Sequence, residues 1–320
     1  ATYGYSDLEA DLPATNNTLF LWEGASMAIT AVAAMQLVES GNLNLDADIR
    51  KLVPEIPEQI STITLRHLLS HKSGLMRNVA GPDALGKKTW DAPPPYEDVI
   101  KALNYFKYSA LEHTPGEDIN VSNLGYVLAS AVIQRASNEP YVEQVLKSIA
   151  RPLEMSTLQP DYLWTERTGR SKDYTKPKAI IREAPAQDLS WQIGSRGWLS
   201  NITDFSKFAH AMLANTLLGE DTQELLWERQ TAKNGEASNY ALGFWSYKDP
   251  SDSDRVVKSI SLRDAVHRNT IRLYPNTGLG IVLLTNSGRY LNAPNTGVNI
   301  EQFRKVVSEL ILNYLKQLKN

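Results

Sequence analysis

The stretch that most constrains this chain of 320 residues is TLFLWEGASMAITAVAAMQL, residues 18–37. Its first residues favour an extended approach. From Ser26 onward, apolar side chains recur every three or four positions, the spacing of one helix face. Good helix formers dominate the segment, and Gly41 follows where a helix end favours a residue tolerant of positive φ. The pattern predicts a long buried helix, whose N-terminus could hold a nucleophile and stabilise an oxyanion.

The bulk composition is that of an ordinary soluble globular protein, with 42% hydrophobic and 22% charged residues. A formal net charge of −3 gives no electrostatic reason to expect nucleic acid or an anionic membrane as partner. No apolar run approaches the roughly 20 residues that a membrane span needs. The absence of cysteine excludes disulfides and thiol catalysis, and scattered histidines without cysteine argue against a structural zinc site. We therefore expect neither a metal nor a cofactor.

Several further motifs follow the predicted helix in order. The first is ITLRHLLSHKSGL at 63–75, which predicts a short helix ending at Gly74, and the second is VSNLGY at 121–126. The third is SRGWLSNITD at 195–204, in which Asn201 or Thr203 should cap the helix that follows. The fourth is YPNTGLGIVLLTN at 274–286, which predicts two strands around a turn at Pro275–Gly278. Together with residues 18–37, these stretches resemble the serine β-lactamase, penicillin-binding protein and esterase superfamily, especially its class C-like branch. The resemblance extends over nearly the whole chain.

The resemblance implies an α/β fold in which an antiparallel sheet is flanked by helices and joined to a mostly helical lobe. We expect residues 1–49 and 186–320 to form the sheet lobe, residues 50–185 the helical lobe, and a cleft to lie between them. Residues near 1–15 should supply a strand of the sheet, and residues 300–318 a closing helix. The family's usual N-terminal helix and first strand have no counterpart here, and such a gap leaves a sheet edge to be covered by another segment or a partner.

The positions that carry chemistry in the family are replaced in this chain. The family's turn reads G-S-x-S-K, in which the first Ser is acylated and the Lys is its proton partner. Alignment on the following Thr-Ala pair puts Gly24 at the nucleophile, Met27 at the Lys and Ser26 at the second Ser. In the family's Y-S-N motif the catalytic Tyr falls on Val121, beside the matching Asn123.

The family's third motif, [HK]-[TS]-G on the strand lining the cleft, allows two alignments. A gapless count back from Pro275 gives Ile260-Ser261-Leu262, and a two-residue shift gives Lys258-Ser259-Ile260. Neither alignment restores the Gly, and a side chain at that position would crowd a substrate approaching the strand edge.

Two residues remain as weak candidates for a relocated catalytic group. Glu23 precedes Gly24; an apolar surround would raise its carboxyl pKa and make it a general base, whereas the ordinary alternative is a solvated carboxylate near a helix N-terminus. His267 lies three residues after Asp264, and exposed polar side chains are the ordinary interpretation of that pair. Lys258 could form a Schiff base only if it were desolvated.

Four other polar or aromatic residues have ordinary structural interpretations. Ser26 lies about 200° round the helix from the nucleophile position and has no acylation role in the family. His67 and His71 are spaced i,i+4, but nothing nearby supplies a third metal ligand. Trp22 reads as a core residue rather than a stacking platform.

The replacements follow one chemical direction, because ionisable or hydroxyl groups have become Gly, Met, Val, and Ile or Leu. Buried polar groups without partners cost free energy, so this direction fits a natural pseudoenzyme and equally a deliberately replaced site. The sequence therefore predicts a catalytically impaired family member whose cleft binds a small-molecule or peptide-like ligand or a partner. Two alternatives stay open: a hydrolase or proton-transfer enzyme using Glu23 or His267, and a scaffold or oligomeric interaction protein. The resemblance also implies a periplasmic or secreted location, although no signal peptide is recognisable in the chain.

Overall fold

The computed structural model describes residues 2–58, 60–78, 98–165, 168–175, 180–231, 235, 238–249, 252–261 and 269–287. The helices in this part are α1 (Ser26–Glu39), α2 (Leu65–Leu69), α3 (Val99–Ala102), α4 (Asn123–Ser137), α5 (Tyr141–Val145), α6 (Ile202–Leu213) and α7 (Glu220–Trp227). The strands are β1 (Tyr5–Asp7), β2 (Leu12–Pro13), β3 (Phe20–Leu21), β4 (Gln159–Pro160), β5 (Tyr174–Thr175), β6 (Arg182–Glu183), β7 (Trp198–Ser200), β8 (Trp245–Asp249), β9 (Asp252–Ser261), β10 (Thr270–Tyr274) and β11 (Leu279–Leu283).

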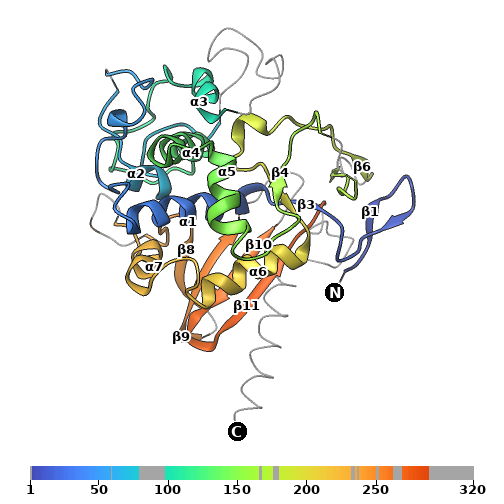
Figure 1. The fold of residues 1–320 in the computed structure, drawn as a ribbon. Helices are drawn as coiled ribbons and strands as arrows, with labels where there is room; N and C mark the ends of the chain where they lie inside the picture. The colour runs from blue at the N-terminus through green and yellow to red at the C-terminus, as the bar shows by residue number, and fades with distance from the viewer. Residues whose placement is uncertain are drawn as a thin grey trace.

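The main sheet is antiparallel, as expected, with strand order β11-β10-β9-β8. Figure 1 shows α6 lying across this sheet, against β10 and β11. The predicted pair of strands around Pro275–Gly278 is confirmed, and the turn closes on Gly278 at a φ of 67°. Together with the helices, the sheet confirms the predicted α/β class.

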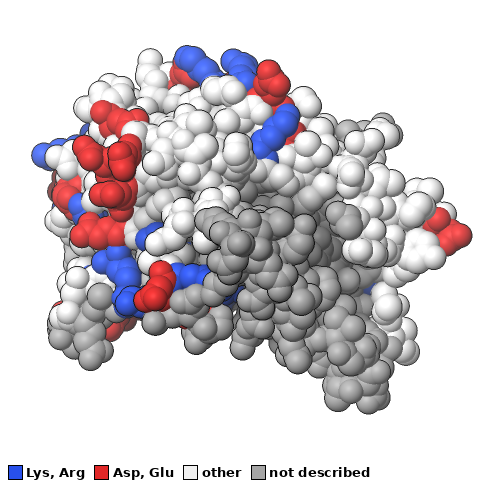
Figure 2. All heavy atoms as spheres, turned by 90° about the horizontal axis from the view of Figure 1, so that it is seen from below, with Lys and Arg blue, Asp and Glu red and all other residues white. Residues whose placement is uncertain are grey.

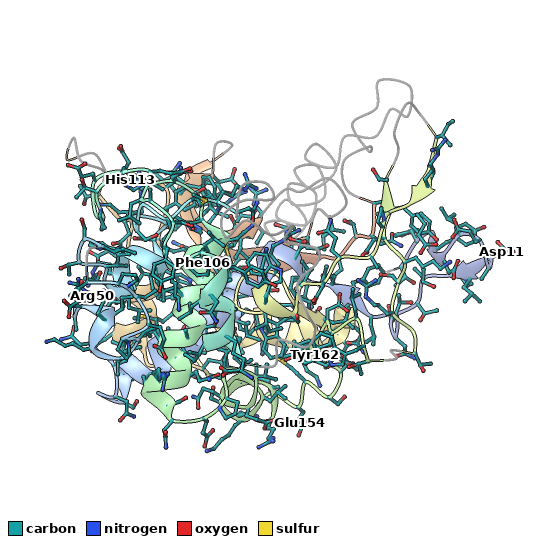
Figure 3. The ribbon with its side chains drawn as sticks, turned by 90° about the horizontal axis from the view of Figure 1, so that it is seen from above. Asp11, Arg50, Phe106, His113, Glu154 and Tyr162 are labelled. Carbon is teal, nitrogen blue, oxygen red and sulfur yellow. The ribbon has the colours of Figure 1, made fainter. Side chains whose placement is uncertain are left out.

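The expectation that residues 1–15 join the main sheet is wrong. β1 and β2 pair with each other as a separate hairpin. Their remaining backbone groups bond elsewhere, since Ser6 O accepts from the Lys172 N–H at 2.8 Å and Tyr5 O accepts from Asn286 Nδ2 at 3.1 Å. Figure 3 shows Asp11 at the tip of this hairpin, far from the buried Phe106.

Helix α1 runs through the middle of the molecule, and its side chains are buried on all sides from Ser26 to Met35. The predicted helix and its end before Gly41 are confirmed, but the apolar stripe is not confined to one face, because α4, α5 and α7 all pack around it. One continuous hydrophobic cluster joins α1 and α4 to Ile260 of β9 and Ile271 of β10. The expected lobe boundaries at 49/50 and 185/186 therefore remain a prediction, and β4 within 50–185 pairs with β7.

Side-chain caps begin α4 and α6, and a residue at positive φ follows the end of α2. Ser122 caps α4 by accepting from the Gly125 N–H, and Asn201 caps α6 as expected. Helix α2 ends at Leu69, earlier than the predicted Gly74, because His71 adopts a φ of 61° that no α-helix continues. The predicted helix at 300–318 lies outside the described residues. Within the described part, no helix combines the length and hydropathy needed to cross a bilayer.

Candidate functional site

The turn at the nucleophile position is held rigidly by the chain on both sides. Strand β3 pairs with β7, and the following residues Glu23–Ala25 form a 3-10 turn that leads straight into α1. Trp22 is fully buried; its Nε1 donates to Ser200 Oγ at 2.7 Å and its ring meets Phe205 edge-on at 4.6 Å. Trp22 is therefore a core residue, as expected, and Gly24 presents no side chain at the helix start.

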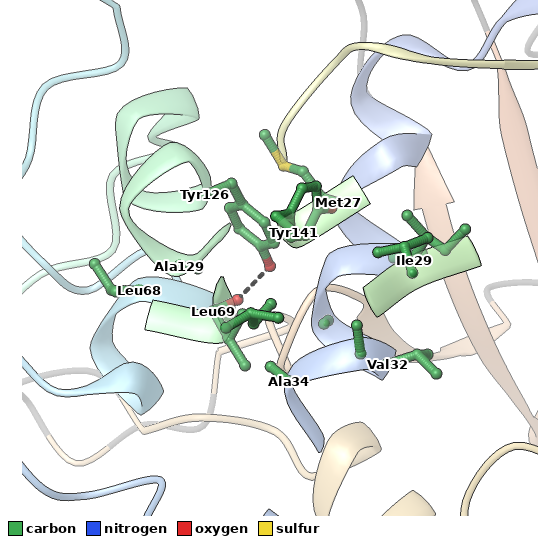
Figure 4. Packing of buried hydrophobic residues seen from close by; sticks show 14 of the residues in the cluster. Met27, Ile29, Val32, Ala34, Leu68, Leu69, Tyr126, Ala129 and Tyr141 are labelled. Carbon is green, nitrogen blue, oxygen red and sulfur yellow. Dashed lines mark hydrogen bonds between the residues drawn. The ribbon is translucent and has the colours of Figure 1, made fainter. Parts of the chain in front are cut away.

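A small apolar cavity occupies the place where the family's reactive groups would meet. Its volume is about 10 Å³, which is the least space that holds one water molecule. It is lined by Met27, His71, Tyr240, Gly243, Phe244, Trp245 and Ile260. Met27 is 1% exposed and Ile260 3%, and Figure 4 shows Met27 within the buried packing around Tyr126. Among the described residues, the centre of the former cleft is thus filled by side chains.

The first residues of the two alignments of the strand motif, Ile260 and Lys258, line different cavities. Ile260 lines the cavity with Met27, whereas Lys258 lines a different cavity beneath α7. Lys258 and Ile260 are two residues apart, so their side chains lie on the same face of the sheet but at different places along the strand. Each can therefore line a different cavity. The gapless alignment, which puts Ile260 at the first position of the motif, therefore stays a prediction that fits this arrangement. Ser259 points the other way and is buried, opposite Trp245 and Arg272.

The Y-S-N segment is held by side-chain hydrogen bonds, and Val121 carries no ionisable group at the position of the family's Tyr. Val121 is half-buried and does not line the cavity. Ser122 Oγ donates to Met76 O at 2.8 Å, and Asn123 Nδ2 donates to Asn78 Oδ1 at 2.6 Å. These contacts fix the start of α4 against the chain after α2.

Glu23 is not the solvated carboxylate of the ordinary interpretation. Its side chain is 7% exposed, and both carboxylate oxygens accept from Arg196 Nε, at 2.9 and 2.7 Å, with Arg196 Nη2 also on Oε1. Its neighbour is thus a guanidinium rather than an apolar surround. The backbone of Glu23 has a φ of 51°, in the left-handed region that favours glycine.

The partner Arg196 is a residue that sequence reasoning missed. A signal was present, since Glu23 stands at the Gly of the family's G-S-x-S-K turn and Arg196 directly precedes Gly197 in a stretch the family writes with paired glycines. Two small residues have thus become an ion pair. The two residues are far apart in the sequence, and only the contact between their side chains in the structure shows that they form a pair.

His71 is buried beside the cavity and is held neutral. Its Nδ1 accepts from the Ser122 N–H at 3.2 Å, so the proton of the neutral ring lies on Nε2. Burial, with a smaller effect from Arg77, lowers the pKa of His71 to about 4. Because His67 instead completes a capping box with Thr64, the two histidines serve structure, as expected.

Of the remaining residues considered from the sequence, Ser26 has a structural role, and His267 and Asp264 are not among the described residues. Ser26 is fully buried and its Oγ accepts from the Trp198 N–H at 3.3 Å, which gives it a structural part. His267 and Asp264 lie outside the described residues, so their role stays a prediction. No group of His, Cys, Asp and Glu in the described part of the chain is arranged to hold a metal ion.

Comparison with known proteins agrees with this arrangement of motifs. The family model described as Beta-lactamase matches residues 1–298. The chain belongs to this family. Among its relatives in the beta-lactamase family is penicillin-binding protein 4* of Bacillus subtilis (strain 168), which is 25% identical over 302 residues, covering 84% of this chain and 63% of that protein. Protein flp of Staphylococcus aureus (strain N315) is 30% identical over 197 residues, covering 58% of this chain and 38% of that protein.

A solved structure supports the fold independently. The octameric penicillin-binding protein homologue from Pyrococcus abyssi superposes with a TM-score of 0.72 at 24% identity, covering 90% of this chain and 66% of its own. The likeness at this identity concerns the fold. The chain spans less than two thirds of the length of the two curated relatives.

Proposed function

We propose that this chain is a non-acylating member of the beta-lactamase family that acts by binding rather than by covalent chemistry. One observation carries the proposal: Met27 and Ile260, which align without gaps with the family's two cationic positions, line a cavity of about 10 Å³. Acyl transfer needs an activated hydroxyl, a base and space for the acyl group. At the helix start Gly24 and Met27 carry neither group. The cavity is also lined by Tyr240, whose pKa burial raises to about 12, and by His71, whose Nδ1 already accepts from the Ser122 N–H. Loss of a nucleophile or base in acyl enzymes lowers the rate on the order of a million-fold.

The volume of the cavity also limits how a ligand can bind. Drug-sized ligands occupy clefts of about 300–1,000 Å³, so a β-lactam or peptide would lie across the former cleft rather than inside it. We therefore infer a surface contact with a peptide-like ligand or a protein partner, with a periplasmic or secreted location following from the family. Assembly into an oligomer, as named for the Pyrococcus abyssi homologue, is one form that such a contact would take.

Covalent labelling tests the proposal directly. The purified chain is incubated with a fluorescent penicillin and, separately, with a fluorophosphonate probe, beside an active serine member of the family as positive control. We expect no labelled band and no mass increase in the intact protein. A stoichiometric acyl adduct on any serine would overturn the proposal, and peptide mapping of the adduct would identify the nucleophile.

A further inference from the structure

The sequence contains three Asn-x-Ser/Thr triplets, the pattern at which secretory pathways attach oligosaccharides to proteins. Their asparagines are Asn16, Asn120 and Asn201. The pattern alone does not distinguish them, because a bulky glycan also needs a side chain that projects from the folded surface. We propose that Asn16 carries an N-linked oligosaccharide, which shields apolar side chains of the neighbouring hairpin. The modification depends on the secreted location proposed above and is independent of the binding function.

Asn16 lies in an exposed turn between the β1–β2 hairpin and strand β3. Two threonines hold this turn, since the Thr18 N–H donates to Thr15 O at 3.1 Å and the Thr15 N–H donates to Thr18 Oγ1 at 2.9 Å. The Asn17 N–H also donates to Thr15 Oγ1, at 3.2 Å. The side-chain amide of Asn16 bonds to no residue in the part of the chain that the structure describes. A sugar on its Nδ2 would therefore break no contact that holds the turn.

The other two asparagines already use their side chains. Asn201 is 8% exposed, and its Oδ1 caps α6 by accepting from the Asp204 N–H at 2.9 Å. A glycan on Asn201 would have to displace this buried cap. Asn120 is exposed, but its Nδ2 donates to Glu112 Oε2. Of the three side-chain amides, that of Asn16 is thus the one that is both exposed and without a bond to the described residues.

The surface beside Asn16 is one on which a glycan would have a physical effect. The hairpin before the turn exposes four large apolar side chains, namely Tyr3, Tyr5, Leu8 and Leu12. The Ala14 N–H donates to Gly4 O at 2.9 Å, which holds the start of the turn against the base of this hairpin. On the face drawn in Figure 2, most described atoms at this end of the molecule belong to uncharged residues, apart from acidic side chains at its extremity. Exposed apolar side chains favour association, and a hydrated oligosaccharide on Asn16 would cover them.

The transfer itself needs one co-reactant, an oligosaccharide linked to a lipid diphosphate. A bond forms between Asn16 Nδ2 and C1 of the first sugar, and the bond between that C1 and the diphosphate oxygen breaks. The lipid diphosphate leaves with the bonding electron pair, and the proton lost from the amide nitrogen passes to a base of the transferring enzyme. The Thr18 hydroxyl completes the triplet that such an enzyme recognises.

Peptide mapping of the secreted protein tests the assignment. The full chain is secreted from insect cells behind a cleavable leader, and its peptides are weighed by mass spectrometry before and after treatment with peptide-N-glycosidase. We expect the Asn16 peptide to carry an oligosaccharide that the enzyme removes, and the Asn201 peptide to be unmodified. Asn16→Gln should lose this glycan completely. The control Asn17→Gln changes the neighbouring exposed residue of the same turn but preserves the triplet, so it should keep the glycan.

The same two variants test the shielding. Binding of a fluorescent dye that reports exposed apolar surface should rise in Asn16→Gln relative to Asn17→Gln, and circular dichroism checks that both are folded. An Asn16 recovered only unmodified from the secreted protein would overturn the assignment, as would a glycan on Asn201 in its place. Equal dye binding by the two variants would contradict the shielding. Because no acylating probe is involved, these failures are distinguishable from a failure of the covalent-labelling test.

Discussion

Glu23 combines two unfavourable features that its partner offsets. A non-glycine residue in the left-handed region costs about 1–2 kcal/mol, and Glu23 also carries a buried charge. Arg196 supplies a bidentate ion pair that makes the burial tolerable. The two residues therefore act as a unit, and replacing either one alone removes this bidentate ion pair from the other.

The first prediction is a strong coupling between these two positions. Arg196→Met should lower the free energy of unfolding by about 3 kcal/mol, because the buried Glu23 carboxylate loses its bidentate ion pair. In Glu23→Gly/Arg196→Met the loss should be smaller by about 2 kcal/mol than the sum of the single losses, since no charge is orphaned and the backbone strain is relieved. Urea unfolding of the four proteins measures this cycle. Additive losses would contradict the coupling.

The second prediction concerns His71 and pH. Its pKa of about 4 in the folded state lies below the ordinary 6.5, so the unfolded chain binds more protons between these values. Stability from this residue is therefore complete above pH 6.5 and is lost as the pH falls towards 4.

From about pH 7.5 to pH 4.5, the free energy of unfolding should fall by about 2.5 kcal/mol on account of His71. The variant His71→Asn tolerates positive φ and keeps a side-chain acceptor, so it should lose correspondingly less over the same range. Urea titrations at the two pH values measure the difference. Equal losses in both proteins would show that His71 titrates normally.

At the scale of elements, the close packing of α1 depends on a glycine in another segment. Gly243 has a φ of 77°, and a Cβ there would lie 2.5 Å from the Ala31 Cβ. Its N–H donates to Leu69 O at 3.0 Å, which ties α2 to the strand region. Gly243 thus allows α1, α2 and β8 to meet at one point.

The third prediction compares this glycine with one that shares its backbone conformation. Gly278→Ala, at a φ of 67° with open space around it, should cost about 1 kcal/mol from backbone strain alone. Gly243→Ala should cost about 3 kcal/mol because it adds a steric clash to the same strain. Thermal and urea unfolding measure both. Similar losses at the two sites would contradict the packing argument.

Periodicity and capping residues predicted the elements that depend on local sequence. The start of α1 at Ser26, the Asn201 cap and the β10–β11 turn followed from such signals. The early end of α2 and the isolated β1–β2 hairpin did not, because each is set by contacts with segments distant in sequence, such as Asn286 with Tyr5. The pairing of Glu23 with Arg196 was not predicted either, because these two residues are also distant in sequence.

At the scale of the whole molecule, the two expected lobes share one core. The main hydrophobic cluster runs from Val99 and Leu128 through α1 to Phe208 and Ile271 without interruption. Separate lobes linked by few contacts would unfold independently, whereas a continuous core favours a single cooperative transition.

The fourth prediction follows from this continuity. Urea unfolding monitored by far-ultraviolet circular dichroism, which reports mostly helix, should coincide with unfolding monitored by tryptophan fluorescence. Trp22 and Trp198 lie beside the sheet end of the core and Trp191 near the helical end. Two separated transitions would instead favour the lobe boundaries expected from the sequence.

The filling of the cleft centre bears on whether a chain like this could regain acyl chemistry by successive mutation. Met27→Lys alone would put an ammonium at a fully buried position beside a cavity of only about 10 Å³, and an unpaired buried charge costs several kcal/mol. Gly24→Ser alone would add a hydroxyl with no base to activate it. Under the proposed function, each of these two single steps is thus either harmful or without benefit, so acyl chemistry would require several substitutions made together rather than one at a time.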